Sequence, residues 1–140
     1  PTMPSGYTYK GLVGAVYNDS GSDFDNFHQV GNSVGSLLVS VLSNGGAASF
    51  TSVDLSVVVP PLAKQVTGAV VADDPNSTAT NLTLAGTAAG LGEAEWREIV
   101  TAITANRVPF RKLLLESQVI YYKMGDTTEN GDIEVSGWEY

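Results

Sequence analysis

The stretch Ile133-Glu134-Val135-Ser136-Gly137-Trp138-Glu139-Tyr140, at the end of the chain, indicates the fold class. Apolar or small residues at 133, 135 and 137 alternate with Glu134 and Ser136, which is the period of two expected of a β-strand with one buried face. Strict alternation would place Trp138 and Tyr140 on the polar face. Either a β-bulge returns Trp138 to the core, or Trp138 lies at a contact surface.

Short runs rich in Val, Thr, Tyr and Leu recur along the rest of the chain, separated by turns rich in Gly, Ser, Asn and Asp. Such spacing, at intervals of about ten residues, is typical of a sandwich or a barrel. Residues 37–42 are predicted to form a buried strand, and residues 53–59 have the cleanest alternation. Apart from residues 92–106, which are discussed next, the predicted strands are 7–17, 24–30, 37–42, 53–59, 65–72, 81–85, 108–115, 119–124 and 133–138.

Residues 92–106 fit two different structures. Trp96, Ile99 and Ile103 fall at helical spacing, and Glu93 lies in what would be the first turn, where a helix dipole favours negative charge. The β-branched residues of the run favour a strand instead. We predict a strand that forms a hairpin with residues 108–115, chiefly because of the resemblance described below, with a short helix near 93–105 as the alternative.

Composition limits the classes of function. The 140 residues suit one domain, which would bury about two-thirds of its unfolded surface. There is no cysteine, so neither disulfides nor thiolate metal sites are available, and no run of eighteen apolar residues that could cross a bilayer. A net charge of −8 repels phosphate backbones and acidic membrane faces. We therefore expect no nucleic-acid partner, no membrane insertion and no cofactor.

Both ends of the chain carry a shared set of weak motifs. Near the start stand Gly6-Tyr7-Thr8-Tyr9-Lys10-Gly11, a run through Tyr17, a turn over residues 18–23, and Phe27-His28-Gln29. Near the finish stand Tyr121-Tyr122-Lys123 and Gly137-Trp138. In order and spacing these motifs resemble the β-sandwich modules that close many bacteriophage tail-fibre, spike and head-fibre proteins. The resemblance covers roughly a third of the residues and is loose over the acidic middle of the chain, residues 92–98.

The resemblance implies a fold and a task. The fold would be all-β, a single antiparallel, jelly-roll-like β-sandwich of eight or nine strands over residues 7–140, with residues 1–6 as a linker from a longer parent chain. The task would be that of a non-catalytic virion structural module in a fibre or spike, including the head spike of a gene transfer agent. It would be a homotrimer on the virion surface, in contact with other virion proteins, and would attach the extracellular particle to a host cell-surface glycan, the bacterial envelope polysaccharide.

Two other functions fit the same sequence. A fibre-capping, assembly or capsid-decoration module would need no receptor, and binding to host cells or to a glycan array would distinguish it from an attachment module. A carbohydrate-binding domain appended to a secreted enzyme would predict catalytic sequence upstream of Pro1.

The sequence offers little support for an enzyme or a metal site. His28 is the single histidine, so a Ser-His-Asp set would have to include it, and we interpret it instead as a residue packed at the rim beside Phe27. Asp19, Asp23 and Asp25 share one loop rich in oxygen ligands, but their spacing differs from that of an EF-hand. We interpret this loop as a solvated turn and predict no metal.

Ligand-binding candidates are the large aromatic residues, which could form a platform for sugars, and the acidic residues of a loop at one end of the sandwich. Each aromatic also fits the core of a small sandwich. The candidates are Trp96, Trp138, Tyr140, Tyr17, Asp73 and Asp74.

Overall fold

The computed structural model describes residues 21, 26–73, 79–99, 107–126 and 128–140, and these residues form nine β-strands and no helix. In chain order the strands are β1 (Phe27–Val30), β2 (Ser33–Gly45), β3 (Thr51–Asp54), β4 (Gln65–Asp73), β5 (Ala79–Ala85), β6 (Ala94–Ile99), β7 (Arg107–Leu113), β8 (Val119–Met124) and β9 (Asn130–Glu139). The predicted all-β class is therefore confirmed. No helix long and apolar enough to cross a bilayer occurs in this part of the chain.

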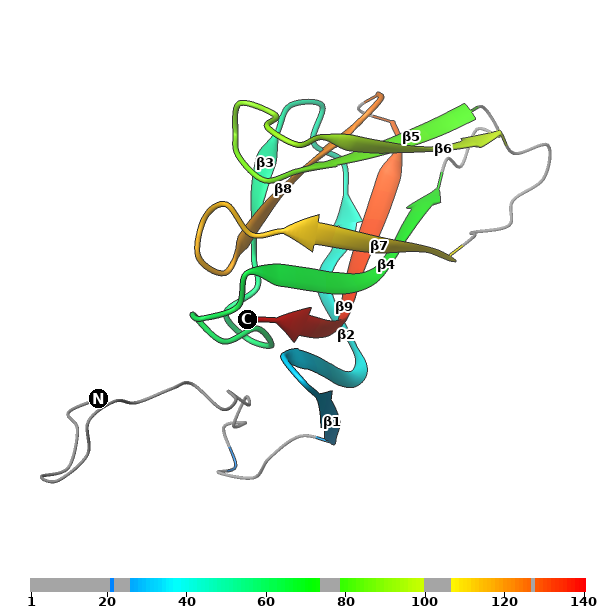
Figure 1. Cartoon of the computed structure of the whole chain (residues 1–140). Coiled ribbons are helices and arrows are strands. Elements are labelled where there is room, and N and C mark those ends of the chain that lie inside the picture. The colour runs from blue at the N-terminus through cyan, green and yellow to red at the C-terminus, as the bar shows by residue number, and fades with distance from the viewer. Residues whose placement is uncertain (1–20, 22–25, 74–78, 100–106, 127) are drawn as a thin grey trace, which may run out of the picture.

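The strands form two antiparallel sheets, one with the order β1-β2-β9-β4-β7 and the other with the order β3-β8-β5-β6 (Figure 1). Apart from β1, the chain passes from one sheet to the other at every step except between β5 and β6. This alternation, with β2-β9-β4-β7 facing β3-β8-β5-β6, is the strand order of an eight-stranded jelly roll. β1 is an additional edge strand, and the hairpin that it forms with β2 extends beyond the body of the sandwich.

The core lies between the two sheets, where side chains of period two from both inner faces meet. In β8 the even positions are buried, and in β9 the odd positions 131 to 137 are buried, as the sequence alternation predicts for 133, 135 and 137. The largest fully buried side chains come from four strands and the segment that follows β3: Leu55, Val59, Val66, Val70, Leu82, Leu84, Ile120, Ile133 and Val135.

A β-bulge at Ser136 decides where Trp138 points. Thr67 of β4 pairs with Gly137 and the next residue, Gly68, pairs with Val135, so Ser136 is an extra residue in β9. The extra residue reverses the alternation, and Trp138 becomes buried in the core with an exposed fraction of 2%. Of the two predicted placements of Trp138, the structure confirms the bulge.

The prediction that residues 37–42 form a strand is correct, but the prediction that this strand is buried is wrong. The ladder between β2 and β9 passes from Gly35, opposite Gly137, to Val39, opposite Val135, so three residues of β2 lie opposite the single Ser136. Leu37 and Leu38 fall in this irregular stretch and are 64% and 45% exposed. Adjacent residues of a regular strand cannot both face the core, and here the bulge turns both leucines outward.

The predicted strand over residues 53–59 is also wrong beyond Asp54, where β3 ends. The backbone amides of Val58 and Val59 donate to the carbonyl of Leu55 at 3.0 and 2.8 Å, which makes a compact turn. Leu55, Val58 and Val59 are buried and Val57 is exposed, because the turn brings residues three and four apart to one side. An alternating sequence is thus compatible with a turn whose apolar residues face the core.

The ambiguous segment 92–106 contains β6, so the strand interpretation is confirmed for Ala94–Ile99, while residues 100–106 lie outside the described residues. The predicted hairpin with residues 108–115 is wrong. β6 pairs with β5, whereas β7 pairs with β4 in the opposite sheet. Strands that are neighbours in sequence often lie in different sheets of a jelly roll, because the chain crosses between the sheets.

Candidate functional site

The predicted aromatic platform does not form from the two tryptophans, which lie in opposite sheets. Trp138 is a core residue of β9. Trp96 of β6 is half-buried and packs edge-on against Phe110 of β7, with ring centroids 6.4 Å apart and an angle of 72° between the planes. Trp96 packs against Phe110 where the edge strands β6 and β7 of the two sheets meet. The structure therefore favours the core interpretation for both tryptophans.

Tyr140 is half-buried against the core, and its hydroxyl has no hydrogen-bond partner among the described residues. Its backbone is held by Asn32, whose side-chain amide donates to the Tyr140 carbonyl at 3.1 Å. Asp73 ends β4, where its backbone lies opposite Asn130. Tyr17 and Asp74 lie outside the described residues. The predicted candidates therefore do not converge on one site in the described part of the chain.

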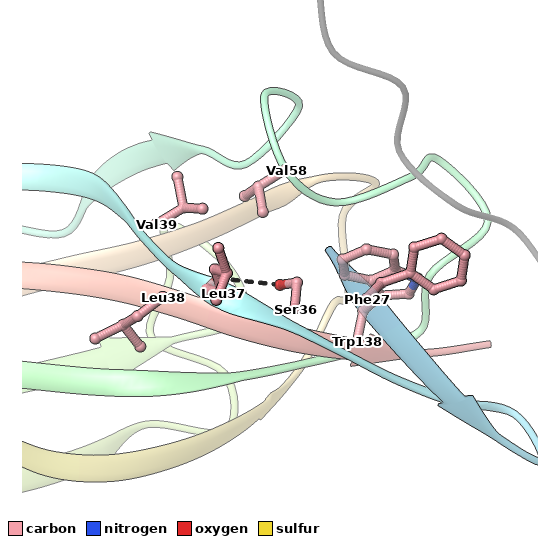
Figure 2. A pocket seen from close by; sticks show the side chains of 7 residues that line it. All are labelled: Phe27, Ser36, Leu37, Leu38, Val39, Val58 and Trp138. Atoms are coloured by element: carbon pink, nitrogen blue, oxygen red, sulfur yellow. Dashed lines mark hydrogen bonds between the residues drawn. The ribbon is translucent and has the colours of Figure 1, made fainter. Parts of the chain in front are cut away.

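An apolar groove lies instead where β1, β2 and β9 meet the turn after β3 (Figure 2). We call this the hairpin groove, and it is lined by Phe27, Ser36, Leu37, Leu38, Val39, Val58 and Trp138. Its volume is about 200 Å³, less than the roughly 300–1,000 Å³ of typical small-molecule sites. In Figure 2, Phe27 and Trp138 lie toward one end of the groove and Leu38 and Val39 toward the other.

The paired irregularities of β2 and β9 produce the hairpin groove. The bulge at Ser136 turns Trp138 inward to form the floor, and the unpaired stretch of β2 turns Leu37 and Leu38 outward to form a wall. The sequence pattern did not predict this groove, although the adjacent leucines were a signal, since a half-buried strand with a period of two cannot bury both.

One polar atom of the hairpin groove is unsatisfied. The indole Nε1 of Trp138 is buried and has no acceptor among the described residues. A buried donor without a partner costs about 1–3 kcal/mol, so such atoms are rare in native proteins. The otherwise apolar lining also includes the hydroxyl of Ser36, which donates to the carbonyl of Leu37 at 3.2 Å.

A second apolar hollow lies beside the turn between β5 and β6. We call it the leucine hollow, after the exposed Leu91, Leu113 and Leu115 that line it. Its volume is about 250 Å³. Lys112, which also lines the hollow, is only 6% exposed, and its ammonium group donates to the carbonyl of Leu84 at 3.1 Å and to that of Gly92.

Lys112 has a structural task at the leucine hollow. Burial lowers the pKa of its ammonium group, and the nearby carboxylate of Glu93 opposes this shift. The two carbonyl acceptors lie at the end of β5 and just before β6, so the charged group holds the turn between these strands against β7. Lys112 was not among the predicted site residues, although Phe110 and Lys112 are two positions apart in one strand and therefore point to the same side.

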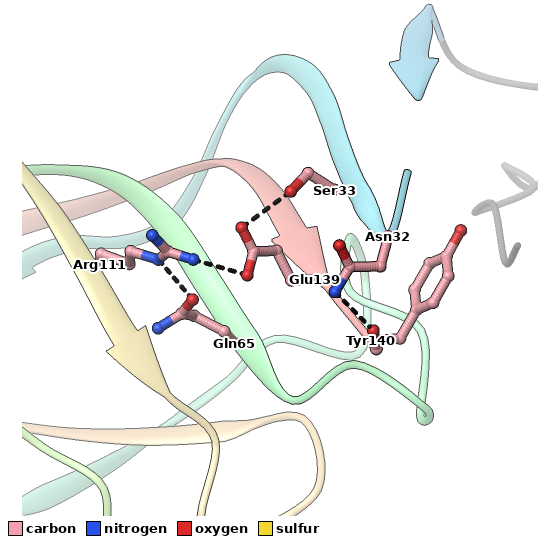
Figure 3. A network of polar contacts seen from close by, with 6 residues as sticks. All are labelled: Asn32, Ser33, Gln65, Arg111, Glu139 and Tyr140. Atoms are coloured by element: carbon pink, nitrogen blue, oxygen red, sulfur yellow. Dashed lines mark hydrogen bonds and ion pairs between the residues drawn. The ribbon is translucent and has the colours of Figure 1, made fainter. Parts of the chain in front are cut away.

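A polar network ties four strands of the larger sheet together near the C-terminus (Figure 3). Arg111 of β7 pairs with Glu139 of β9 at 2.6 Å and also donates to Gln65 of β4, and Ser33 of β2 donates to Glu139 at 2.8 Å. The hydrogen bond from Ser33 and the pairing with Arg111 lower the pKa of Glu139. Every member of this network has a partner, which is typical of a structural network across neighbouring strands.

Other charged residues also have structural partners. Arg107 makes a bidentate pair with Glu134 at 2.6 and 2.7 Å, and the buried carboxylate of Glu129 accepts from the amide of Gly125 at 3.0 Å. The ring of His28, an exposed residue of β1, lies against Gly35 in the hairpin. Among the described residues no three His, Asp or Glu side chains are grouped so that they could hold a metal ion.

No protein-family model matches this sequence, and a search of curated proteins finds no significant match. The function must therefore be argued from the fold and from the two apolar sites.

Proposed function

We propose that this chain is a non-catalytic structural module of a phage or phage-like particle, of the fibre or spike type, that attaches the particle to a bacterial surface polysaccharide. The sequence motifs at both ends of the chain support this proposal. The jelly-roll order also supports it by analogy, because viral capsid proteins and lectins both use this fold. A net charge of −8 suits a protein on the exposed surface of a particle.

The observation that carries a binding role is the leucine hollow. Three leucines with exposed fractions of 53–61% line one concavity, together with the polar residues Gln65, Arg111 and Lys112. Monomeric proteins seldom leave large apolar side chains grouped on the surface, and such groups usually mark a contact with another protein. The leucine hollow therefore supports the homotrimer that we propose, in which three weak glycan sites would act together.

The capping or assembly role is the second candidate, and one observation favours it. Trp138 is buried and Trp96 is half-buried against Phe110, so the two tryptophans do not form an exposed aromatic platform of the kind that sugars stack on. A module that only joins protein to protein needs the leucine hollow and no such platform.

One experiment on the purified chain distinguishes these roles. We would measure the molar mass by light scattering, and the binding to an array of bacterial polysaccharides, for the wild type and three variants. Leu113→Asp places a charge in the leucine hollow, whereas Val57→Asp places the same charge on another exposed apolar residue. Thr128→Arg alters the exposed loop between β8 and β9.

Attachment predicts a wild-type trimer that binds glycan, with the trimer lost in Leu113→Asp and kept in Val57→Asp. Loss of glycan binding in Thr128→Arg, with the trimer intact, would locate recognition in that loop. An intact trimer that binds no glycan and no host cells would favour the assembly role. A wild-type monomer that binds nothing would contradict both.

A further inference from the structure

Lys112 carries a buried positive charge that is not paired with any carboxylate of the described residues. Only 6% of the residue is exposed. Its ammonium group has three N–H donors, and the carbonyls of Leu84 and Gly92 accept from two of them. None of the ion pairs in the described part of the chain includes Lys112. Buried charges in proteins are normally paired, because a desolvated charge without a counter-charge is costly.

Glu93 influences Lys112 through space but does not pair with it. Its carboxylate opposes the lowering of the Lys112 pKa by burial. However, the side chain of Glu93 is 59% exposed, and its Oε2 lies 3.9 Å from Nζ of Lys123. Within the described residues, the ammonium of Lys112 therefore has two carbonyl acceptors and no direct counter-charge.

This charge lies at the wall of the leucine hollow. Gly92, whose carbonyl accepts from the ammonium, lines the hollow together with Lys112 itself. Arg111 lines it as well, but its guanidinium is already paired with Glu139. No Asp or Glu of the described residues lines the hollow, and three exposed leucines form much of its wall. Such a wall complements an aliphatic surface that carries a carboxylate.

A second copy of this chain can supply that surface. Each copy has fifteen Asp and Glu residues against seven Lys and Arg, so carboxylates are in excess on every copy. A closed trimer joins its subunits through heterologous contacts, in which the hollow of one subunit meets a different surface of the next. The carboxylate that enters the hollow therefore does not have to lie near the hollow of its own chain.

We propose that the leucine hollow receives an Asp or Glu carboxylate of the neighbouring copy, which pairs with the ammonium of Lys112. Apolar side chains beside that carboxylate cover Leu91, Leu113 and Leu115. The inference rests on the trimer of the proposed function and names the chemistry of its contact. Two N–H groups of the ammonium then hold the turn between β5 and β6 of their own chain, and the third binds the neighbour.

Zero-length cross-linking of the wild-type protein tests this pairing. A carbodiimide joins an amine to a carboxylate that is in contact with it, and isotope-labelled and unlabelled chains refolded together let mass spectrometry distinguish interchain from intrachain links. Burial lowers the pKa of Lys112, which leaves more of its amine in the neutral form that reacts. Lys123 and Glu93, 3.9 Å apart in one chain, provide an intrachain reference link.

We expect an interchain link from Lys112 to an Asp or Glu, more abundant than any interchain link from the exposed Lys64. A Lys112 link to Glu93 of the same chain alone would overturn the pairing. The absence of any Lys112 link in a sample that contains the reference link would overturn it too.

Two variants provide an independent measurement. Lys112→Met keeps an unbranched apolar side chain and removes the charge, and Lys64→Met makes the same change at an exposed lysine. Because the neighbour's carboxylate loses its buried partner, the dissociation constant of the trimer, measured by sedimentation, should rise by about thirtyfold or more in Lys112→Met and stay unchanged in Lys64→Met. Circular dichroism checks that Lys112→Met folds, and the cross-link in the wild type decides if it does not.

The outcomes separate this contact from the trimer itself. Equal dissociation constants in the two lysine variants would overturn the pairing, while the trimer of the proposed function would still be tested by Leu113→Asp. A wild-type monomer would remove that trimer and this contact with it.

Discussion

Replacing Gly68 by Ala is the most direct test of how β4 and β9 fit together. Gly68 lies opposite Val135, next to the bulge at Ser136, and a Cβ at residue 68 would overlap the backbone carbonyl oxygen of Glu134. The same Cβ would lie 2.8 Å from Cε1 of Phe110. Real Cβ atoms do not approach other heavy atoms this closely, so β9 or β4 must move.

The cost follows from what has to move. Adding one methyl group to a packed core costs about 1–3 kcal/mol when side chains can adjust. Here the nearer obstacle is the backbone of a central strand, which cannot rotate away, and the second is a buried ring. We therefore expect the free energy of unfolding to fall by at least about 3 kcal/mol, and the melting temperature by roughly 10 °C for a domain of this size.

Chemical denaturation followed by circular dichroism and tryptophan fluorescence would measure this loss. Ala69→Val is the matched control, because Ala69 is the next residue of β4 and points to the opposite, half-buried face. The control should stay within about 0.5 kcal/mol of the wild type. A Gly68→Ala protein that loses less than about 1 kcal/mol would show that the close approach of β4 and β9 at the bulge is wrong.

Three further predictions concern stability and titration. Ile133→Ala should lower the free energy of unfolding by about 2–5 kcal/mol, since Ile133 is fully buried, whereas Val57→Ala at an exposed position should change it little in the same urea titration. The pKa of Glu139 is below its ordinary 4.5, so the ionised carboxylate contributes its full stabilisation above that pH and loses it as the pH falls through the folded pKa. In Glu139→Gln, the free energy of unfolding measured by urea titration should therefore fall less between pH 7 and pH 3 than in the wild type. The hydroxyl of Tyr121 donates to the carboxylate of Glu116 at 2.8 Å, which raises the pKa of Tyr121 above 10.0. The stabilisation from this hydrogen bond is present below that pH and is lost as the pH rises through the folded pKa. Ultraviolet titration should show that pKa lowered in Glu116→Gln, and an unchanged titration would argue against the hydrogen bond.

Much of the fold could be predicted from local patterns. The period of two in β9 indicated that residues 133, 135 and 137 face the core, because a strand alternates its side chains whatever its neighbours are. A turn residue also marked one strand end, at Gly31 between β1 and β2, where the backbone has a positive φ of 62°. These features depend on the covalent geometry of a few adjacent residues, so the sequence contains them.

The functional sites were predicted poorly for the opposite reason. The hairpin groove depends on one extra residue in β9, Ser136, and on the irregular stretch of β2 that faces it, and neither is visible until the two strands are paired. The leucine hollow brings Leu91 beside Leu113, which belongs to a strand of the other sheet. Contacts between residues far apart in the chain carry no local signal.

The amino-acid sequence by itself determined the all-β class, the alternation within most strands and the acidic surface, since these follow from side-chain size, charge and the geometry of an extended backbone. Only the tertiary structure decided which sheet each strand joins, that Trp138 points inward, and that Leu37 and Leu38 point outward. Strand pairing and register are set by the packing of two whole faces against each other, and a shift of one residue reverses every side chain beyond it.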